Sequence, residues 1–254
     1  MNKLDEIKSK VIVVKDLVKK FGSFVANDHL NFEVGRGEIF GFLGANGAGK
    51  TTAMRILCGL SKPTSGNVRV AGFDVYTQTE KIKAHIGYMS QRFSLYEDLT
   101  VSENFQFYGG IYGLSRMEVK EKLENMLNRL QLDAMRKRLI RTLPPGIRQK
   151  VAFSIAIMHE PEIAFLDEPT GGVDPITRRQ FWEMIYETAA KGITVFVTTH
   201  YMDEAEYCDR ISIMVDGRIE ALDTPAALKQ QYDAPSINDV FLKLARKPAT
   251  NIQP

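Results

Sequence analysis

Gly44-Ala45-Asn46-Gly47-Ala48-Gly49-Lys50-Thr51 is the stretch of this sequence that decides the fold. It fits the pattern Gly-x-x-x-x-Gly-Lys-[Ser/Thr], whose glycines let backbone N–H groups approach phosphate oxygens. The apolar run 39–43 predicts a buried strand before the loop, and the pattern 52–60 predicts a helix after it. The positive end of that helix points at the same anion. The stretch therefore predicts a nucleotide-binding loop between a strand and a helix.

Two side chains of this loop carry most of its chemistry. Lys50 adds a mobile positive charge for the β- and γ-phosphates, so we also assign it a catalytic role. The hydroxyl of Thr51 suits Mg²⁺, a cation that prefers oxygen ligands. The nucleotide-binding assignment covers the loop and the first residue beyond it: Gly44, Ala45, Asn46, Gly47, Ala48, Gly49, Lys50, Thr51 and Thr52.

A second apolar stretch, Ile163-Ala164-Phe165-Leu166, ends in the carboxylates Asp167 and Glu168. We expect Asp167 in the Mg²⁺ shell and Glu168 as the general base that polarises the attacking water. Acidic pairs also cap strands and face solvent, and the pair alone fits both interpretations equally. The phosphate loop upstream favours the catalytic one.

His200 follows the apolar stretch 194–199, which predicts another strand. Folds with parallel sheets bind ligands at the carboxyl ends of their strands. We therefore expect His200 to hydrogen-bond the γ-phosphate, although a lone histidine is more often structural.

Composition excludes several classes of protein. The 254 residues carry 33 Lys and Arg against 31 Asp and Glu, a net charge of +2, so no nucleic-acid partner is expected. The longest apolar stretches, such as 151–158 and 193–197, fall far short of the ~20 residues that span a bilayer. Cys58 and Cys208 lie far apart in mostly apolar surroundings, which predicts buried, reduced thiols.

The chain divides into three regions by pattern. Up to about Ser90 it predicts strands with tight turns, at 11–14, 30–34 and 67–70. From about 92 to 146 it predicts helices, with capping boxes at Thr100/Glu103 and Ser115/Glu118. Behind the second box an apolar stripe indicates core packing: Val119, Leu123, Met126, Leu127 and Leu130.

From about Val151 helices and short apolar strands alternate. The pattern predicts helix 148–159, strand 163–166, helix 175–190 with a stop at Gly192, and strand 193–198. Thr224-Pro225 predicts the start of another helix. Such alternation indicates a parallel sheet with helical crossovers.

Taken together, these residues resemble the nucleotide-binding subunit of ATP-binding-cassette (ABC) transporters over nearly the whole chain. Gln91, after Gly87-Tyr88-Met89-Ser90, looks like the Q-loop glutamine. Asp174, in Gly171-Gly172-Val173-Asp174, looks like the acid of the D-loop, and His200 looks like the switch histidine. Phe21 looks like the aromatic residue that stacks on adenine, although its chemistry alone favours a core position. The stretches 199–205 and 172–175 look most like multidrug exporters of the ABC-2 type.

The resemblance implies an α/β fold of the P-loop NTPase class. Its RecA-like core has a mostly parallel sheet, joined by an antiparallel β subdomain and an inserted helical subdomain. A single ABC ATPase domain would cover 1–254. The core with the β subdomain would take 1–91 and 160–245, the helical subdomain 92–159, and a flexible tail 246–254.

The resemblance also implies a mechanism. Two cassettes, identical or not, face each other, and each ATP lies between the phosphate loop of one and the signature loop of the other. Mg²⁺ would be held by Thr51, Gln91 and Asp167, while Gly146 and Asp174 would act across the dimer interface. A transmembrane permease, docked on the Q-loop and the region 92–150, would turn closure and hydrolysis into export. The chain would lie peripherally on the cytoplasmic face of the inner (plasma) membrane.

One motif departs from the family. Where the family has Leu-Ser-Gly-Gly-Gln, this chain has Leu143-Pro144-Pro145-Gly146-Ile147. The serine hydroxyl is gone and neither proline has an N–H to offer, while Gly146 and a helix starting near Ile147 remain. A lost donor to a buried phosphate oxygen should cost about 1–3 kcal/mol. We hypothesise weaker closure or slower turnover and a non-identical partner with an intact signature. Family drift, with Gly146 sufficient, fits equally well.

Two other functions compete with the exporter ATPase. A soluble cassette acting on ribosomes or DNA usually carries two cassettes or a long coiled coil, neither of which this sequence has. A regulatory cassette would bind ATP with little hydrolysis. Glu168 argues against that reading, and the altered signature argues for it.

Overall fold

The computed structural model describes residues 10–91 and 95–246. Its larger sheet has the strand order β10-β9-β3-β8-β7-β6. The strands are β3 (Ile39–Gly44), β6 (Ile86–Met89), β7 (Ile163–Asp167), β8 (Thr194–Thr199), β9 (Arg210–Val215) and β10 (Arg218–Asp223). All neighbouring pairs are parallel except β9 with β10. The parallel sheet that the alternation of helices and strands predicts is therefore confirmed.

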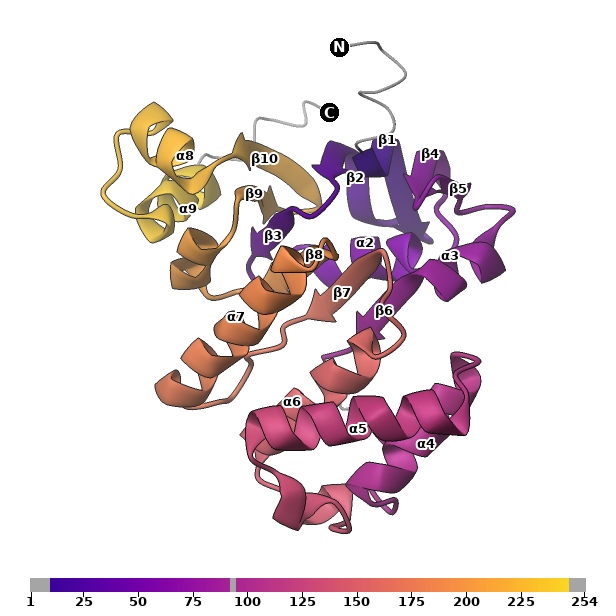
Figure 1. Ribbon diagram of the computed structural model, residues 1–254. Coiled ribbons are helices and arrows are strands. Elements are labelled where there is room, and N and C mark those ends of the chain that lie inside the picture. The colour runs from indigo at the N-terminus through magenta and orange to yellow at the C-terminus, as the bar shows by residue number, and fades with distance from the viewer. Residues whose placement is uncertain (1–9, 92–94, 247–254) are drawn as a thin grey trace.

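A second, antiparallel sheet has the order β2-β1-β4-β5 and lies beside the first (Figure 1). Its strands are β1 (Lys10–Phe21), β2 (Phe24–Gly35), β4 (Ser65–Val70) and β5 (Phe73–Asp74). Helix α2 (Lys50–Leu57) contacts strands of both sheets, and α3 (Thr79–His85) leads into β6. The rings of Phe32, Phe40 and Phe196 pack 5.5–6.2 Å apart, centre to centre, so β2 of one sheet and β3 and β8 of the other share one core.

Three helices occupy the end of the molecule opposite the antiparallel sheet (Figure 1): α4 (Val101–Ile111), α5 (Arg116–Leu130) and α6 (Pro145–Ile157). Short 3-10 turns at Asp133–Met135 and Ile140–Thr142 connect the last two. Both predicted capping boxes are present, at Thr100 and Ser115. The predicted apolar stripe of α5 is buried, apart from the half-buried Leu130 at its margin.

The remaining helices are α7 (Pro175–Ala190), the 3-10 helix η3 (Met202–Tyr207), α8 (Pro225–Gln231) and α9 (Ile237–Ala245). Helix α7 has the predicted bounds, and the strand predicted at 193–198 is shifted by one residue. The prediction that a helix covers 148–159 and starts near Ile147 is wrong at both ends. The fixed φ of Pro145 suits the first helical position, where no N–H is needed, so α6 starts there.

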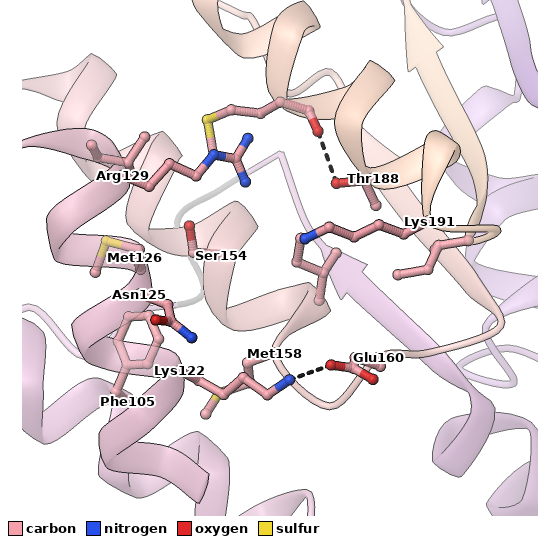
Figure 2. A pocket seen from close by; sticks show the side chains of 14 residues that line it. Phe105, Lys122, Asn125, Met126, Arg129, Ser154, Met158, Glu160, Thr188 and Lys191 are labelled. Carbon is pink, nitrogen blue, oxygen red and sulfur yellow. Dashed lines mark hydrogen bonds and ion pairs between the residues drawn. The ribbon is translucent and has the colours of Figure 1, made fainter.

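A cavity of about 170 Å³ separates the C-terminal halves of α5 and α7 (Figure 2). The ion pairs Lys122–Glu160 and Arg129–Glu187 flank it. Its floor includes Met158, which is part of the buried core, and none of the candidate site residues line it. The cavity thus lies where the three-helix end meets α7 and is separate from the candidate site.

Within 10–91 and 95–246, no helix has both the length and the apolar character needed to cross a bilayer. Residues 247–254, most of the predicted tail 246–254, lie outside the described residues, as does the predicted start of the helical subdomain at 92. Cys58 and Cys208 are free and buried, as predicted. The α/β fold with a mostly parallel core, an antiparallel sheet and added helices is confirmed.

Candidate nucleotide site

The phosphate loop is the turn between the end of β3 and the start of α2. Gly49 lies at its tightest point, with a φ of 100°. A Cβ on Gly49 would come within 2.3 Å of the Ala26 carbonyl oxygen, so only glycine fits there. Asn27, next to Ala26 on β2, donates its side-chain amide Nδ2 to the Gly49 carbonyl at 3.1 Å. Strand β2 therefore fixes the shape of the loop from outside.

Lys50 is buried and folded back onto its own loop. Its Nζ donates to the carbonyls of Gly44, at 2.8 Å, and Ala45, at 3.1 Å, and lies 3.4 Å from Glu168 Oε1. Burial lowers the pKa of Lys50, and the charge of Glu168 opposes that shift. The cation thus already lies between the loop and the strand-end acids.

Asp167, the last residue of β7, faces the phosphate loop. Thr198 Oγ1 donates to its Oδ1 at 2.6 Å, and Thr51 Oγ1 donates to the same oxygen at 3.2 Å. Burial raises the pKa of Asp167. The two threonine hydrogen bonds lower it, but by a smaller amount, so the pKa lies above its ordinary value. The loop at 44–51 and the acids at 167 and 168 are therefore close enough to share one ligand.

Glu168 gathers three of the predicted residues around one carboxylate. Its Oε2 accepts a hydrogen bond from Gln91 Nε2 at 2.9 Å and lies 3.0 Å from His200 Nδ1, while its Oε1 faces Lys50. Its backbone has a φ of 49°, an uncommon conformation for a side-chain-bearing residue. The Glu168 N–H donates to both the carbonyl and the hydroxyl of Thr198, at 3.1 and 3.0 Å, which holds this conformation.

A cavity of about 450 Å³ opens over these groups. It is lined by Phe24, Ala26, Asn46, Gly47, Gly49, Lys50, Thr51, Thr52, Gln91 and Glu168. Three predicted loop residues do not line it: Gly44 and Ala45 offer their carbonyls to Lys50, and Ala48 is buried. Phe24 and Ala26 line the cavity without having been predicted.

Phe21 lies at the end of β1, opposite Phe24 across the hairpin. It is 55% exposed, with the Lys19 ammonium 4.8 Å from its ring centre, so the core position that its chemistry favours is wrong. Phe24 is 63% exposed and is the aromatic residue that lines the cavity. Phe24 is the first residue of β2, directly after the turn residues Gly22 and Ser23. The alternation of apolar and polar residues along the strand does not predict its exposure.

Gly146 and Asp174, predicted to act across a dimer interface, lie near each other. A Cβ on Gly146 would come within 2.6 Å of Thr177 Cγ2, so α6 can approach α7 this closely only at a glycine. The Thr177 hydroxyl donates to Asp174 Oδ2 at 2.6 Å, and Asp174 caps α7. In the described residues neither contacts the phosphate loop. The N–H groups of Ile147 and Arg148 are used within the first turn of α6, since both donate to the Pro144 carbonyl.

Sequence comparison places the chain among known transporter components. The family described as ABC transporter matches residues 27–171. The probable multidrug ABC transporter ATP-binding protein YbhF of Escherichia coli K12 is 48% identical, over 92% of this chain and 41% of that protein. The linearmycin resistance ATP-binding protein LnrL of Bacillus subtilis 168 is 35% identical, over 94% of this chain and 80% of that protein. The chain thus spans about two fifths of the length of YbhF.

Solved structures agree with the sequence comparison. An ATP-binding subunit of an ABC transporter superposes with a TM-score of 0.85, at 29% identity, over 93% of this chain and all of that one. The ATP-binding cassette MJ0796, solved as a post-hydrolysis dimer with ADP and phosphate, gives a TM-score of 0.77 at 26% identity, over 84% of this chain and 98% of that one. The chain belongs to the ABC transporter family.

Proposed function

We propose that this chain binds ATP with Mg²⁺, dimerises with a second cassette when ATP is bound, and powers a membrane exporter by hydrolysing it. The observation that carries the proposal is the meeting of two distant segments. Thr51 Oγ1 lies 3.2 Å from Asp167 Oδ1, and Lys50 Nζ lies 3.4 Å from Glu168 Oε1. Loop and acids therefore enclose one place for a triphosphate.

The oxygen donors at this place fit Mg²⁺. A threonine hydroxyl and a carboxylate are the hard ligands that Mg²⁺ takes, together with substrate phosphates and water. Thr51, Asp167 and Gln91 would hold the ion, which when bound neutralises charge on the phosphates. Lys50 would leave the loop carbonyls to bind the β- and γ-phosphates. Glu168 would take the proton of the attacking water, and His200 would hydrogen-bond the γ-phosphate.

An aromatic surface for the base is available on the β1–β2 hairpin. Phe21 is the residue that the family pattern favours, and Phe24 is the residue that lines the cavity. Both rings are more than half exposed, so either could stack on adenine without leaving a core. We propose that Phe24 contributes to base binding together with Phe21.

The wider role follows from the relatives. The names of YbhF and LnrL describe a probable multidrug transporter and linearmycin resistance, which supports export as the process that this cassette drives. We propose a peripheral position at the cytoplasmic face of the inner membrane, with a permease docked on the Q-loop and the region 92–150. The second cassette would meet Gly146 and Asp174.

A Glu168→Gln variant tests the chemistry. It should keep ATP binding but lose turnover and accumulate as an ATP-bound dimer, because the amide cannot accept the water proton. ATPase rate and oligomeric state in Mg²⁺-ATP, against the parent protein, measure both. If the variant hydrolyses ATP at the parental rate, Glu168 is not the base.

Purification from native membranes tests the permease: recovery without a transmembrane chain would favour the soluble or regulatory alternative.

A further inference from the structure

A buried carboxylate lies outside the residues assigned to the nucleotide site. Glu204, in η3, has no solvent exposure. Its Oε1 accepts a hydrogen bond from Thr170 Oγ1, and Arg178 Nε lies 3.6 Å from the same oxygen. Its Oε2 has no hydrogen-bond partner among the described residues. A buried carboxylate that loses its positively charged neighbour is costly, so Glu204 stabilises Arg178 in its observed place.

From Arg178 the contacts run toward His200. The Arg178 guanidinium carbon lies 4.2 Å from the centre of the Tyr201 ring, a distance typical of a guanidinium stacked on an aromatic face. The Tyr201 ring centre lies 4.2 Å from that of His200, with 35° between the ring planes. The His200 imidazole then faces Glu168, with Nδ1 3.0 Å from Oε2. Glu204 is thus connected to the proposed base through three side chains.

A second path leads from Glu204 to the same base. Thr170 lies in the turn directly after Glu168, and the Gly171 N–H closes that turn by donating to the Glu168 carbonyl at 3.1 Å. By bonding Thr170, Glu204 holds the turn that carries Glu168. The same buried carboxylate therefore fixes both partners of the Glu168–His200 contact.

We propose that Glu204 and Arg178 are positioning residues for ATP hydrolysis, which set the orientation of the His200 imidazole against Glu168 through Tyr201. The inference rests on the role given to His200 in the proposed function. Neither Glu204 nor Arg178 lines the nucleotide cavity, so their effect on turnover passes through other side chains. A purely structural buried pair would affect only stability.

Three substitutions separate geometry from charge. Arg178→Lys keeps a positive charge near Glu204 but loses the planar group that stacks on Tyr201. Tyr201→Leu removes the ring, and Tyr201→Phe keeps it. Arg178→Lys and Tyr201→Leu should lower kcat by about tenfold or more, with KM for ATP changed by less than about twofold. Tyr201→Phe should keep the parental kcat, because the ring is still present.

Arg179→Lys is the matched control. Arg179 is the next residue on α7, with an exposed side chain that pairs with Glu183 one turn away. It bears the same substitution without any contact to the ring of Tyr201. Its kcat should stay within about twofold of the parent.

Histidine ring NMR gives a readout independent of hydrolysis. The chain has four histidines, so few ring signals arise, and the His200 signal is the one absent from His200→Ala. In nucleotide-free protein, Arg178→Lys and Glu204→Gln should move the His200 signal. Arg179→Lys should leave it in place.

Each result decides between the explanations. A kcat for Arg178→Lys within about twofold of the parent, when His200→Ala loses more than tenfold, would overturn the positioning role. So would an unmoved His200 signal combined with a lower melting temperature, which describes a structural pair. A parent protein without ATPase activity, or an unaffected His200→Ala, would instead refute the proposed function. The ring signals would still report on the positioning.

Discussion

Replacing Asp167 with Asn should leave the nucleotide-free protein at least as stable as the parent. Asp167 is only 1% exposed and burial raises its pKa, so the fold already disfavours its charge. Asn has the same shape and still accepts from Thr51 and Thr198. Two charge-assisted hydrogen bonds become neutral, a loss of about 1 kcal/mol each. Relief of the desolvation penalty, several kcal/mol per buried ion, outweighs that loss.

The pH dependence of this gain has a defined sign. Because the pKa of Asp167 in the folded protein lies above its ordinary value of 3.8, the folded state binds the proton more tightly than the unfolded state. The charged carboxylate therefore destabilises the parent at pH values above the folded pKa. The penalty disappears as pH falls through that pKa toward 3.8. The stability advantage of Asp167→Asn should be largest at neutral pH and should shrink on acidification.

Ligand binding should show the opposite effect. At a hundred times its Kd, Mg²⁺-ATP adds about 2.7 kcal/mol to the free energy of unfolding. For a chain of this length, that raises the melting temperature by about 5–11 °C. If Asp167 holds the metal, the shift for the parent should fall when EDTA replaces Mg²⁺. In Asp167→Asn, ATP should raise the melting temperature by the same amount with Mg²⁺ as with EDTA.

Thermal melts with and without nucleotide measure both effects. Glu168→Gln is the matched control, since it makes the same chemical change one residue along and should keep the Mg²⁺-dependent shift. An Asp167→Asn protein that keeps the parental difference between Mg²⁺ and EDTA would refute the metal assignment. A nucleotide-free melting temperature well below the parent's would refute the argument from burial.

Three further experiments test other parts of the site. Lys50→Ala should weaken ATP binding by at least tenfold in a titration with labelled nucleotide, because the main cation between loop and acids is lost; unchanged affinity would contradict its phosphate role. If its ring stacks on the base, Phe24→Ala should weaken the binding free energy of ATP by about 1–3 kcal/mol. Phe21→Ala is the comparison, and both variants should bind inorganic triphosphate as the parent does. If only Phe21→Ala weakens ATP binding, Phe24 has no such role. Pro144→Ser combined with Pro145→Gly should raise the ATPase rate, because a donor is restored to the signature; no gain over the parent would favour family drift.

The parts of the fold that the sequence predicts are those set by local chemistry. The phosphate loop between β3 and α2 follows from glycine geometry, and the capping boxes at Thr100 and Ser115 are hydrogen bonds within four residues. Helix α6 starts at Pro145, earlier than predicted, because Pro145 takes the first helical position. A proline lacks only the N–H that a first helical position does not use.

The parts of the site that escape prediction depend on distant contacts. Phe24 lines the cavity because the start of β2 lies beside the phosphate loop, and no local pattern fixes that approach. Glu204 looks like an ordinary acid in a polar stretch of sequence. Its polar partners in the buried interior are Thr170 and Arg178, which are 34 and 26 residues away along the chain. Pairings of this range are set by the whole sheet, so only the structure reveals them.

The contacts of Glu168 also bear on how its carboxylate is oriented. In the structure its carboxylate is shared among Lys50, Gln91 and His200. In the proposed function Lys50 would bind the phosphates and Gln91 would help to hold the metal, so both would have a partner besides Glu168. His200 would keep its Nδ1 contact with Glu168 while its other ring nitrogen meets the γ-phosphate. The contact between Glu168 and His200 is therefore the one that would persist in the proposed function, and it is the one that we propose Glu204 and Arg178 position.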